Sequence, residues 1–213
     1  MNIEDYAKKH PKISGASLSP RILEKIQELP DGSRILDIGC AEGFTIERLA
    51  YQFEKEFEFV GVDLSETRIK SATEKEIHSA KFIVSSGESI PLEDNSFDCI
   101  LCSQVLEHVE SDEKLLKEIY RLLKPRGIFQ VDTVFKKKWA WYFYKSPMGW
   151  ALDPTHLREY EDLEEMRELF SKQHLKIELI EKKQAYRDLS KVSPIKLKLP
   201  IPGYYIVFVV GNK

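Results

Sequence analysis

The sequence has few features that would anchor a chain in a membrane or stabilise it outside the cell. Only three of its 213 residues are cysteines: Cys40, Cys99 and Cys102. An odd number of thiols in apolar surroundings indicates reduced, buried cysteines and predicts a cytoplasmic protein. No apolar run approaches the roughly 18 residues that a membrane-spanning helix needs. Residues 1–5 lack the basic and apolar regions of a signal peptide.

The chain also lacks an excess of positive charge. It carries 32 Lys and Arg against 35 Asp and Glu, a formal net charge of −3, and its pI is about 6.0. No global basic field is present to collect nucleic acid, so a nucleic-acid partner is not expected. The length fits one domain, 1–213, and leaves little room for a second.

Candidate metal ligands are scarce as well. Cys99 and Cys102 have CxxC spacing, but they lie in an apolar segment that is typical of a buried strand. Residues three apart in a strand point to opposite faces, so these thiols are expected to diverge. No second ligand pair accompanies them, and the sequence predicts no metal site.

The sequence does contain a regular alternation of strands and helices. An amphipathic helix is predicted over 18–29, with Pro20 in its first turn, as part of a helical extension over 1–30. Alternating apolar strands and amphipathic helices follow through residue 135, and Ser111 is expected to cap the helix over 111–123. Strands at 175–181 and 204–210 have no helix between them and should pair antiparallel, joined by a loop over 193–203. The prediction is an α/β, Rossmann-like sheet of seven mostly parallel strands with an antiparallel last strand and helices on both faces.

A small-residue turn directly after the first strand is the clearest candidate binding site. Asp37, Gly39, Ala41 and Gly43 allow close approach of a ligand to the backbone, at the N-terminus of the next helix. Asp63 closes the second strand, about where an acid accepts both hydroxyls of a ribose. A dinucleotide is the rival ligand, but the Asp37 and Glu42 carboxylates would repel a pyrophosphate. They suit a ligand that carries an ammonium and a sulfonium.

A series of motifs over about residues 34–135 resembles the class I S-adenosylmethionine-dependent methyltransferases. Residues 35–43 (ILDIGCAEG) are similar to the first family motif, and residues 61–65 (GVDLS) to the second. Residues 88–98 (ESIPLEDNSFD), 106–109 (LEHV) and 122–127 (LLKPRG) continue the series. The resemblance is closest to the small-molecule branch that includes the quinone-biosynthesis methyltransferases.

The resemblance implies S-adenosylmethionine as cofactor, S-adenosylhomocysteine as product, and a role for each matching residue. The turn would line the methionine end, Asp63 would hold the ribose hydroxyls, and Leu64 would pack on the adenine. Ser86 and Gly87 would flank the adenine edge, and Ser103 and Gln104 would border the methionine and the reaction centre. The implied cofactor-binding residues are Asp37, Gly39, Cys40, Ala41, Gly43, Asp63, Leu64, Ser86, Gly87, Ser103 and Gln104.

Two of these positions depart from the family pattern. Ala41 replaces the usual middle glycine, and it is expected to fit only with a negative φ or an adjusted loop. Ser86 stands where the family commonly has an acid that accepts from the adenine amino group. Its hydroxyl can still accept, and Glu88 could compensate.

An aromatic and basic segment over 136–160 is expected to be an irregular insertion on the substrate side. Trp139, Trp141 and Tyr142 suit an apolar lid over a hydrophobic substrate. Contact with a membrane surface and simple core packing are alternatives. His156 has a pKa near neutrality and could act as a general base, and Arg158 could anchor an anionic group of the substrate. In the purely structural alternative, Arg158 pairs with Asp153.

The function indicated by these features is methyl transfer by in-line displacement to a small, apolar or amphipathic metabolite. Two alternatives stay open: an acceptor that is a tRNA, a protein or a lipid-linked glycan, and a non-catalytic protein that only binds a cofactor. The sequence does not indicate the acceptor atom or the oligomeric state.

Overall fold

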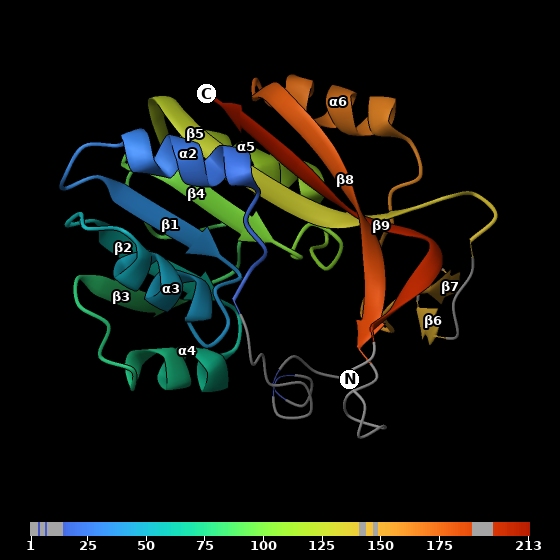
Figure 1. Ribbon diagram of the computed structural model, residues 1–213, viewed down its shortest axis with the longest axis horizontal. Helices are drawn as coiled ribbons and strands as arrows, with labels where there is room; N and C mark the ends of the chain where they lie inside the picture. Colours follow the sequence, from blue (N-terminus) through green and yellow to red (C-terminus); the bar gives the residue numbers. More distant parts are fainter. Residues whose placement is uncertain (1–3, 5–6, 8–14, 141–143, 147–148, 189–197) are drawn as a thin grey trace.

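The main sheet has seven strands in the order β3-β2-β1-β4-β5-β9-β8 (Figure 1). A computed structural model describes residues 4, 7, 15–140, 144–146, 149–188 and 198–213. The strands of the sheet are β1 (Arg34–Ile38), β2 (Glu58–Asp63), β3 (Ala80–Val84), β4 (Phe97–Ser103), β5 (Leu123–Lys136), β8 (Lys176–Asp188) and β9 (Lys198–Asn212). The first five pair in parallel, whereas β9 runs antiparallel to both of its neighbours. The predicted sheet is therefore confirmed, including its antiparallel last strand.

Helices cover both faces of this sheet. They are α2 (Pro20–Glu28), α3 (Phe44–Gln52), α4 (Glu66–Thr73), α5 (Asp112–Leu122) and α6 (Leu163–Lys172). Apolar residues of α2 and α3 form one hydrophobic cluster with the sheet, and those of α5 and α6 form another. In Figure 1, α2 and α3 lie in front of the strands and α5 lies behind them. Apolar residues that recur every 3.6 positions give each helix one apolar side, and side chains of successive strand residues point to opposite faces of the sheet. The apolar sides of the helices pack on these faces and produce the layers.

Serine side chains cap the N-termini of α2, α4 and α5. The hydroxyls of Ser19, Ser65 and Ser111 each accept a hydrogen bond from the backbone N–H three residues later. Pro20 occupies the first turn of α2, where its missing N–H costs no hydrogen bond. The predicted roles of Pro20 and Ser111 are confirmed.

The two cysteines of the CxxC spacing diverge as expected. Cys99 belongs to the cluster under α2 and α3, and Cys102 to the cluster under α5 and α6. Both are buried, and burial raises the pKa of Cys99 far above its usual value. They are core residues on opposite faces of β4.

Two predictions for the C-terminal half were wrong. Residues 198–203 belong to β9, and residues 198–200 pair with β8, so the second half of the predicted loop over 193–203 is strand. Residues 189–197 lie outside the described residues. Pro200 is tolerated because β9 meets β5 only from Tyr204 onward, which leaves a two-stranded ribbon before it. The segment 136–160, expected to be irregular, contains a small hairpin of β6 (Tyr144–Ser146) and β7 (Gly149–Ala151).

A third, smaller hydrophobic cluster joins this segment to the β8–β9 ribbon. It contains the buried residues Val134, Ala140, Ala185, Ile201 and Tyr204. Leu152 packs against it from the segment that follows β7. The insertion is therefore attached to the main sheet through a core of its own.

Candidate functional site

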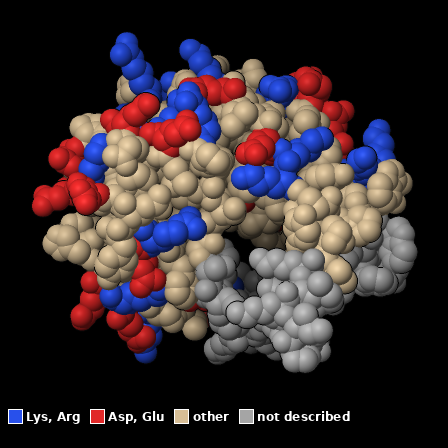
Figure 2. All heavy atoms as spheres, in the orientation of Figure 1, with Lys and Arg blue, Asp and Glu red and all other residues tan. Residues whose placement is uncertain are grey.

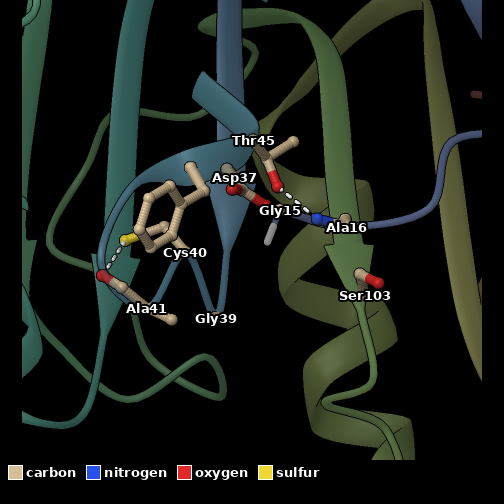
Figure 3. A pocket seen from close by; sticks show the side chains of 9 residues that line it. Gly15, Ala16, Asp37, Gly39, Cys40, Ala41, Thr45 and Ser103 are labelled. Carbon is tan, nitrogen blue, oxygen red and sulfur yellow. Dashed lines mark hydrogen bonds between the residues drawn. The ribbon is translucent and has the colours of Figure 1, made fainter. Parts of the chain in front are cut away.

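Two cavities lie around the carboxyl ends of β1, β2 and β4, and Gly39 lines both of them. The smaller one is shown in Figure 3 and is lined by Gly15, Ala16, Asp37, Gly39, Cys40, Ala41, Phe44, Thr45 and Ser103. The larger one has a volume of about 930 Å³. We call its wall at residues 63–64 and 86–87, together with the turn 37–43, the donor side. Its wall at residues 107–108, 134 and 152–157 is the acceptor side.

The donor-side turn requires glycine at two positions. Gly39 and Gly43 have φ values of +74° and +75°, in the left-handed region that side chains disfavour. A Cβ on Gly39 would lie 2.3 Å from Cγ2 of Val105. The absence of a side chain at Gly39 therefore lets Val105 pack directly against the turn.

Ala41 does not have a negative φ, the first of the two expected alternatives, so the adjusted loop is the alternative that applies. Its φ is +49°, so this alanine adopts the left-handed conformation, at a cost of roughly 1–2 kcal/mol. The Ala41 N–H donates a hydrogen bond to Oδ2 of Asp63 over 3.0 Å. This buried bond holds the alanine in a conformation that the family's usual glycine would adopt freely.

Asp63 is held rigidly at the end of β2. Its Oδ1 accepts from the N–H of Ser65 over 2.9 Å, and the residue is 8% exposed. Each carboxylate oxygen has a second lone pair, so Asp63 can also accept from ribose hydroxyls in the larger cavity. The neighbouring Leu64 is 54% exposed at the same wall, where an apolar surface suits an adenine ring.

Ser86 and Gly87 line the larger cavity, as the resemblance implied for the adenine edge. The Ser86 hydroxyl accepts from the N–H of Glu88. Oε1 of Glu88 accepts from the N–H of Ser111 over 2.9 Å, beside the start of α5. Glu88 therefore serves the helix terminus, and we do not assign it the compensating adenine contact that the sequence allowed.

The two acids of the turn have different surroundings. Asp37 is 2% exposed and its carboxylate points toward Gly15 and Ala16 inside the smaller cavity (Figure 3). Glu42 instead forms an ion pair with Arg68, with 3.7 Å between Oε1 and Nε. Asp37 is therefore the acid of this turn that can meet an ammonium group in the smaller cavity.

Sequence reasoning missed Asp132, a buried acid at the end of the donor side. Its Oδ1 accepts from the hydroxyl of Ser103 and the amide of Gln104, both over 3.0 Å, and its Oδ2 accepts from the amide of Gln130. Gln104 also has a positive φ of 54°. Asp132 thus positions Ser103 at the end of β4 and Gln104 directly after it, the two residues that the resemblance assigned to the border of the reaction centre. Two polar residues on one face of an otherwise apolar strand were the available signal.

A short N-terminal segment crosses the smaller cavity. The N–H of Ala16 donates to Oγ1 of Thr45, and Nη2 of Arg48 donates to the carbonyl of Ala16, both over 2.7 Å. The amide of Gln130 donates to the carbonyl of Ser17. Gly15 and Ala16 therefore line the smaller cavity although no motif indicates them.

His156 lies on the acceptor side and is 4% exposed. Its Nδ1 is 2.7 Å from Oε1 of Glu159, and its ring lies 4.9 Å from that of His108 in an edge-to-face arrangement. Burial raises the pKa of Glu159, but hydrogen bonds from His156 and from the N–H of Leu152 outweigh it and leave that pKa below its usual value. Glu159, which sequence reasoning missed, therefore orients the His156 ring.

Glu107 is a second acceptor-side acid that the sequence did not assign. It is fully buried, and its Oε2 accepts from the hydroxyl of Thr133 over 2.8 Å. Burial raises the pKa of Glu107 to about 7, against the lowering effect of nearby His156 and Thr133. The cavity wall thus brings Glu107, His108 and His156 together.

The other substrate-side candidates have different positions. The Arg158 guanidinium donates to the carbonyls of Leu106, Val109 and Glu110, and it pairs with Asp112. The structure therefore uses Arg158 to brace the loop after β4, and Asp153 accepts from Thr155 instead. Trp139 is 62% exposed and lies beside Gly203. Trp141 and Tyr142 lie outside the described residues.

No helix in the described parts of the chain has the length and apolar character needed to cross a bilayer.

Comparison with known proteins identifies the family. A family model described as "Methyltransferase domain" matches residues 36–131. The uncharacterized methyltransferase YcgJ of Bacillus subtilis (strain 168) is 30% identical over 195 residues, which cover 89% of this chain and 71% of that protein. The ubiquinone/menaquinone biosynthesis C-methyltransferase UbiE of Rickettsia akari is 32% identical, over 70% of this chain and 67% of its own length.

Solved structures share the fold. The crystal structure of YcgJ has a TM-score of 0.67 at 23% identity and covers 91% of this chain and 97% of that one. Phosphoethanolamine N-methyltransferase 2 of Haemonchus contortus, solved with phosphomonomethylethanolamine and S-adenosylhomocysteine, has a TM-score of 0.71 at 21% identity. That match covers 95% of this chain and 54% of the other. On the strength of the family model and of the relatives, the chain belongs to the class I S-adenosylmethionine-dependent methyltransferases and resembles those of quinone biosynthesis.

Proposed function

We propose that this enzyme transfers the methyl group to a small, apolar or amphipathic metabolite by in-line displacement. One observation carries the proposal: a single cavity of about 930 Å³ extends from the donor side at Asp63 and Leu64 to the acceptor side at Val134, Leu152 and His156. A volume of this size suits a small molecule beside a cofactor.

The residues of the donor side would hold the cofactor without taking part in bond making. Asp37 would bind its ammonium group, Asp63 the ribose hydroxyls and Leu64 the adenine. When bound, S-adenosylmethionine supplies a methyl group that is already activated on a sulfonium. Ser103 and Gln104, positioned by Asp132, would border the methyl group. Alignment of the two reactants in this way can lower a barrier by several kcal/mol, up to roughly 7–11 in ideal cases.

The acceptor side would contact the metabolite through both apolar and polar side chains. Val134 and Leu152 offer apolar contact, and His156 would contact the polar atom of the acceptor. Trp139 stays a candidate at the outer part of the segment 136–160, which we propose to be the substrate-side part of a single domain over 1–213. We also propose that the enzyme acts in the cytoplasm.

Small acceptors are supported by the names of related proteins and by the surface charge. UbiE and the demethylmenaquinone methyltransferases are named for quinone biosynthesis, and a structural neighbour was solved with phosphomonomethylethanolamine. Figure 2 shows Lys and Arg interspersed with Asp and Glu on the face in view. With a net charge of −3, this arrangement favours a small metabolite over a nucleic acid.

Calorimetry and methyl transfer together test the proposal. S-adenosylmethionine should bind the intact protein with a stoichiometry of about one, as a single cofactor site requires, and Asp63→Ala should largely remove this binding. Asp31→Ala, which removes an exposed acid before β1, is the matched control and should leave it unchanged. Labelled S-adenosylmethionine with pooled small metabolites should then yield a labelled small product. Label that enters only tRNA or protein, or no transferred label at all, would contradict the proposed acceptor.

A further inference from the structure

We infer that Glu107, His108 and His156 form a binding site for a divalent transition-metal cation of the zinc type. The candidate ligand atoms of these three residues lie within 4.8 Å of one another. All three residues line the larger cavity, on its acceptor side. The inference rests on the proposed function only for the role of the cation, because the cluster itself is a feature of the described residues.

Each of the three side chains is already oriented by a neighbour through an atom that the cation would not use. Nδ1 of His156 is 2.7 Å from Oε1 of Glu159, and Oε2 of Glu107 accepts from Thr133 over 2.8 Å. Nδ1 of His108 is 3.2 Å from Oγ1 of Thr155. Such outer contacts fix ring orientation and tautomer at metal sites, and here they leave Nε2 of each histidine available to a cation.

An unsatisfied buried oxygen is the second observation that points to a ligand. Oε1 of Glu107 is fully buried and has no hydrogen-bond partner among the described residues. A buried carboxylate oxygen without a partner is costly, and native structures rarely contain one. A cation held between Oε1 and the two imidazoles would satisfy it.

The surrounding charges favour a cation. Asp153 and Glu159 contact Thr155 and His156 respectively, so three carboxylates including Glu107 surround the two imidazoles. The Lys136 ammonium lies 3.4 Å from Oε2 of Glu159, on the side of that carboxylate away from His156. The same ammonium lies 3.6 Å from Oε1 of Glu161, so it does not neutralise the carboxylates around the imidazoles, and a divalent cation would interact favourably with them.

The kind of ligands selects the kind of metal. Two imidazoles and one carboxylate are a ligand set of catalytic zinc sites and of related transition-metal sites, whereas Mg²⁺ and Ca²⁺ prefer oxygen ligands. Three protein ligands leave a coordination position open. In this site the open position would face the cavity, where an oxygen of the methyl acceptor could occupy it. The inference thereby narrows the acceptor class to metabolites with an oxygen donor.

A cation at this position would change the role of His156. The lone pair of Nε2 cannot bind a metal and accept a proton at the same time. His156 would therefore orient the acceptor through the cation and would not act as the general base that the sequence suggested.

Zinc titration of the tag-free, chelator-treated full chain tests the inference. Calorimetry should show one Zn²⁺ per chain, and Co²⁺ should give the visible absorption of a four-coordinate site. Glu107→Gln and His108→Ala should each weaken Zn²⁺ binding by at least about 100-fold, the upper end of the loss that outer-contact changes cause. Glu159→Gln should weaken it by about 10- to 100-fold. His78→Ala, which removes an exposed histidine, should have no effect.

Cofactor binding in the same samples shows that each variant is folded. Absence of Zn²⁺ binding to the intact chain, or equal binding by all variants, would overturn the inference. Full methyl transfer by chelator-treated protein would overturn the role of the cation in orienting the acceptor, and would leave the proposed function intact. Tight Zn²⁺ binding that depends on Glu107 and His108 supports the site even if no small acceptor is found, in which case the proposed function alone fails.

Discussion

The donor side and the acceptor side of the cavity are shaped by different parts of the chain. On the donor side, backbone conformation decides the shape: Gly39, Ala41 and Gly43 all have positive φ, and a main-chain N–H reaches Asp63. On the acceptor side, packed side chains such as His156, Glu159 and Leu152 decide it. The shape of the donor side therefore depends on main-chain conformation, whereas the shape of the acceptor side depends on side-chain packing.

The largest expected effect comes from closing the donor-side turn. Gly39→Ala adds a Cβ 2.3 Å from Val105 in a left-handed conformation, so cofactor affinity should fall by about 100-fold, or about 2.8 kcal/mol. Calorimetry with S-adenosylhomocysteine measures the loss.

Gly32→Ala is the matched control for this change, because Gly32 has the same φ of +74° but nothing within 4 Å of an added Cβ. It should lose some stability and keep full cofactor affinity. Equal affinity in both variants would show that the turn does not shape the donor side.

The next largest effect is expected from changing Asp132, the side chain that positions Ser103 and Gln104. Asp132→Asn would replace one of two acceptor oxygens by an NH2 group that faces a donor, on the side of either Gln130 or Ser103 and Gln104, so the free energy of unfolding should fall by about 1–3 kcal/mol. Urea denaturation measures this value. Asp94→Asn, in an exposed pair with Arg121, should cost less than about 1 kcal/mol. Similar losses in the two variants would contradict the positioning role of Asp132.

A pair of truncations should separate the two sides directly. Leu64→Ala should weaken cofactor binding by about fivefold, because about 1 kcal/mol of apolar contact with the adenine is lost. Leu152→Ala should raise the KM of the acceptor by a similar factor and leave cofactor affinity unchanged. Calorimetry measures cofactor affinity and steady-state kinetics measure the KM of the acceptor in both variants. If either variant changes both quantities, the two sides are not independent.

The smallest expected effect is an increase in stability. Ala41→Gly removes the left-handed strain of roughly 1 kcal/mol, and thermal unfolding should shift to a higher temperature. Ser79→Gly, at an exposed turn with φ of +58°, should stabilise the fold to a similar extent. If the Ala41 conformation matters to the cofactor, its affinity should rise in Ala41→Gly and stay constant in Ser79→Gly.

The sequence predicted most of what local patterns encode. Periodicity located the strands and helices, and Ser111 and Pro20 marked helix starts, because these signals arise within a few residues. Residues at the cofactor positions were proposed from a motif that is contiguous in the chain. These roles remain predictions, although the geometry around Asp37 and Asp63 is compatible with them.

Contacts between distant segments were outside the reach of a single sequence. Glu107 bonds Thr133 across 26 residues, and Arg158 reaches the carbonyl of Leu106 across 52. The left-handed Ala41 was missed because it depends on Asp63, 22 residues away. Such pairings have no local period, so only the folded arrangement reveals them.

The small core behind the acceptor side has a consequence for how the molecule opens. Val134, Ala140, Ala185, Ile201 and Tyr204 form a cluster separate from the two that hold the main sheet. Because fewer apolar contacts secure it, its amide hydrogens should exchange with solvent sooner than those of β1 and β4. Local opening of this cluster would therefore loosen the cavity wall at Val134 and Leu152 while the main sheet stays folded.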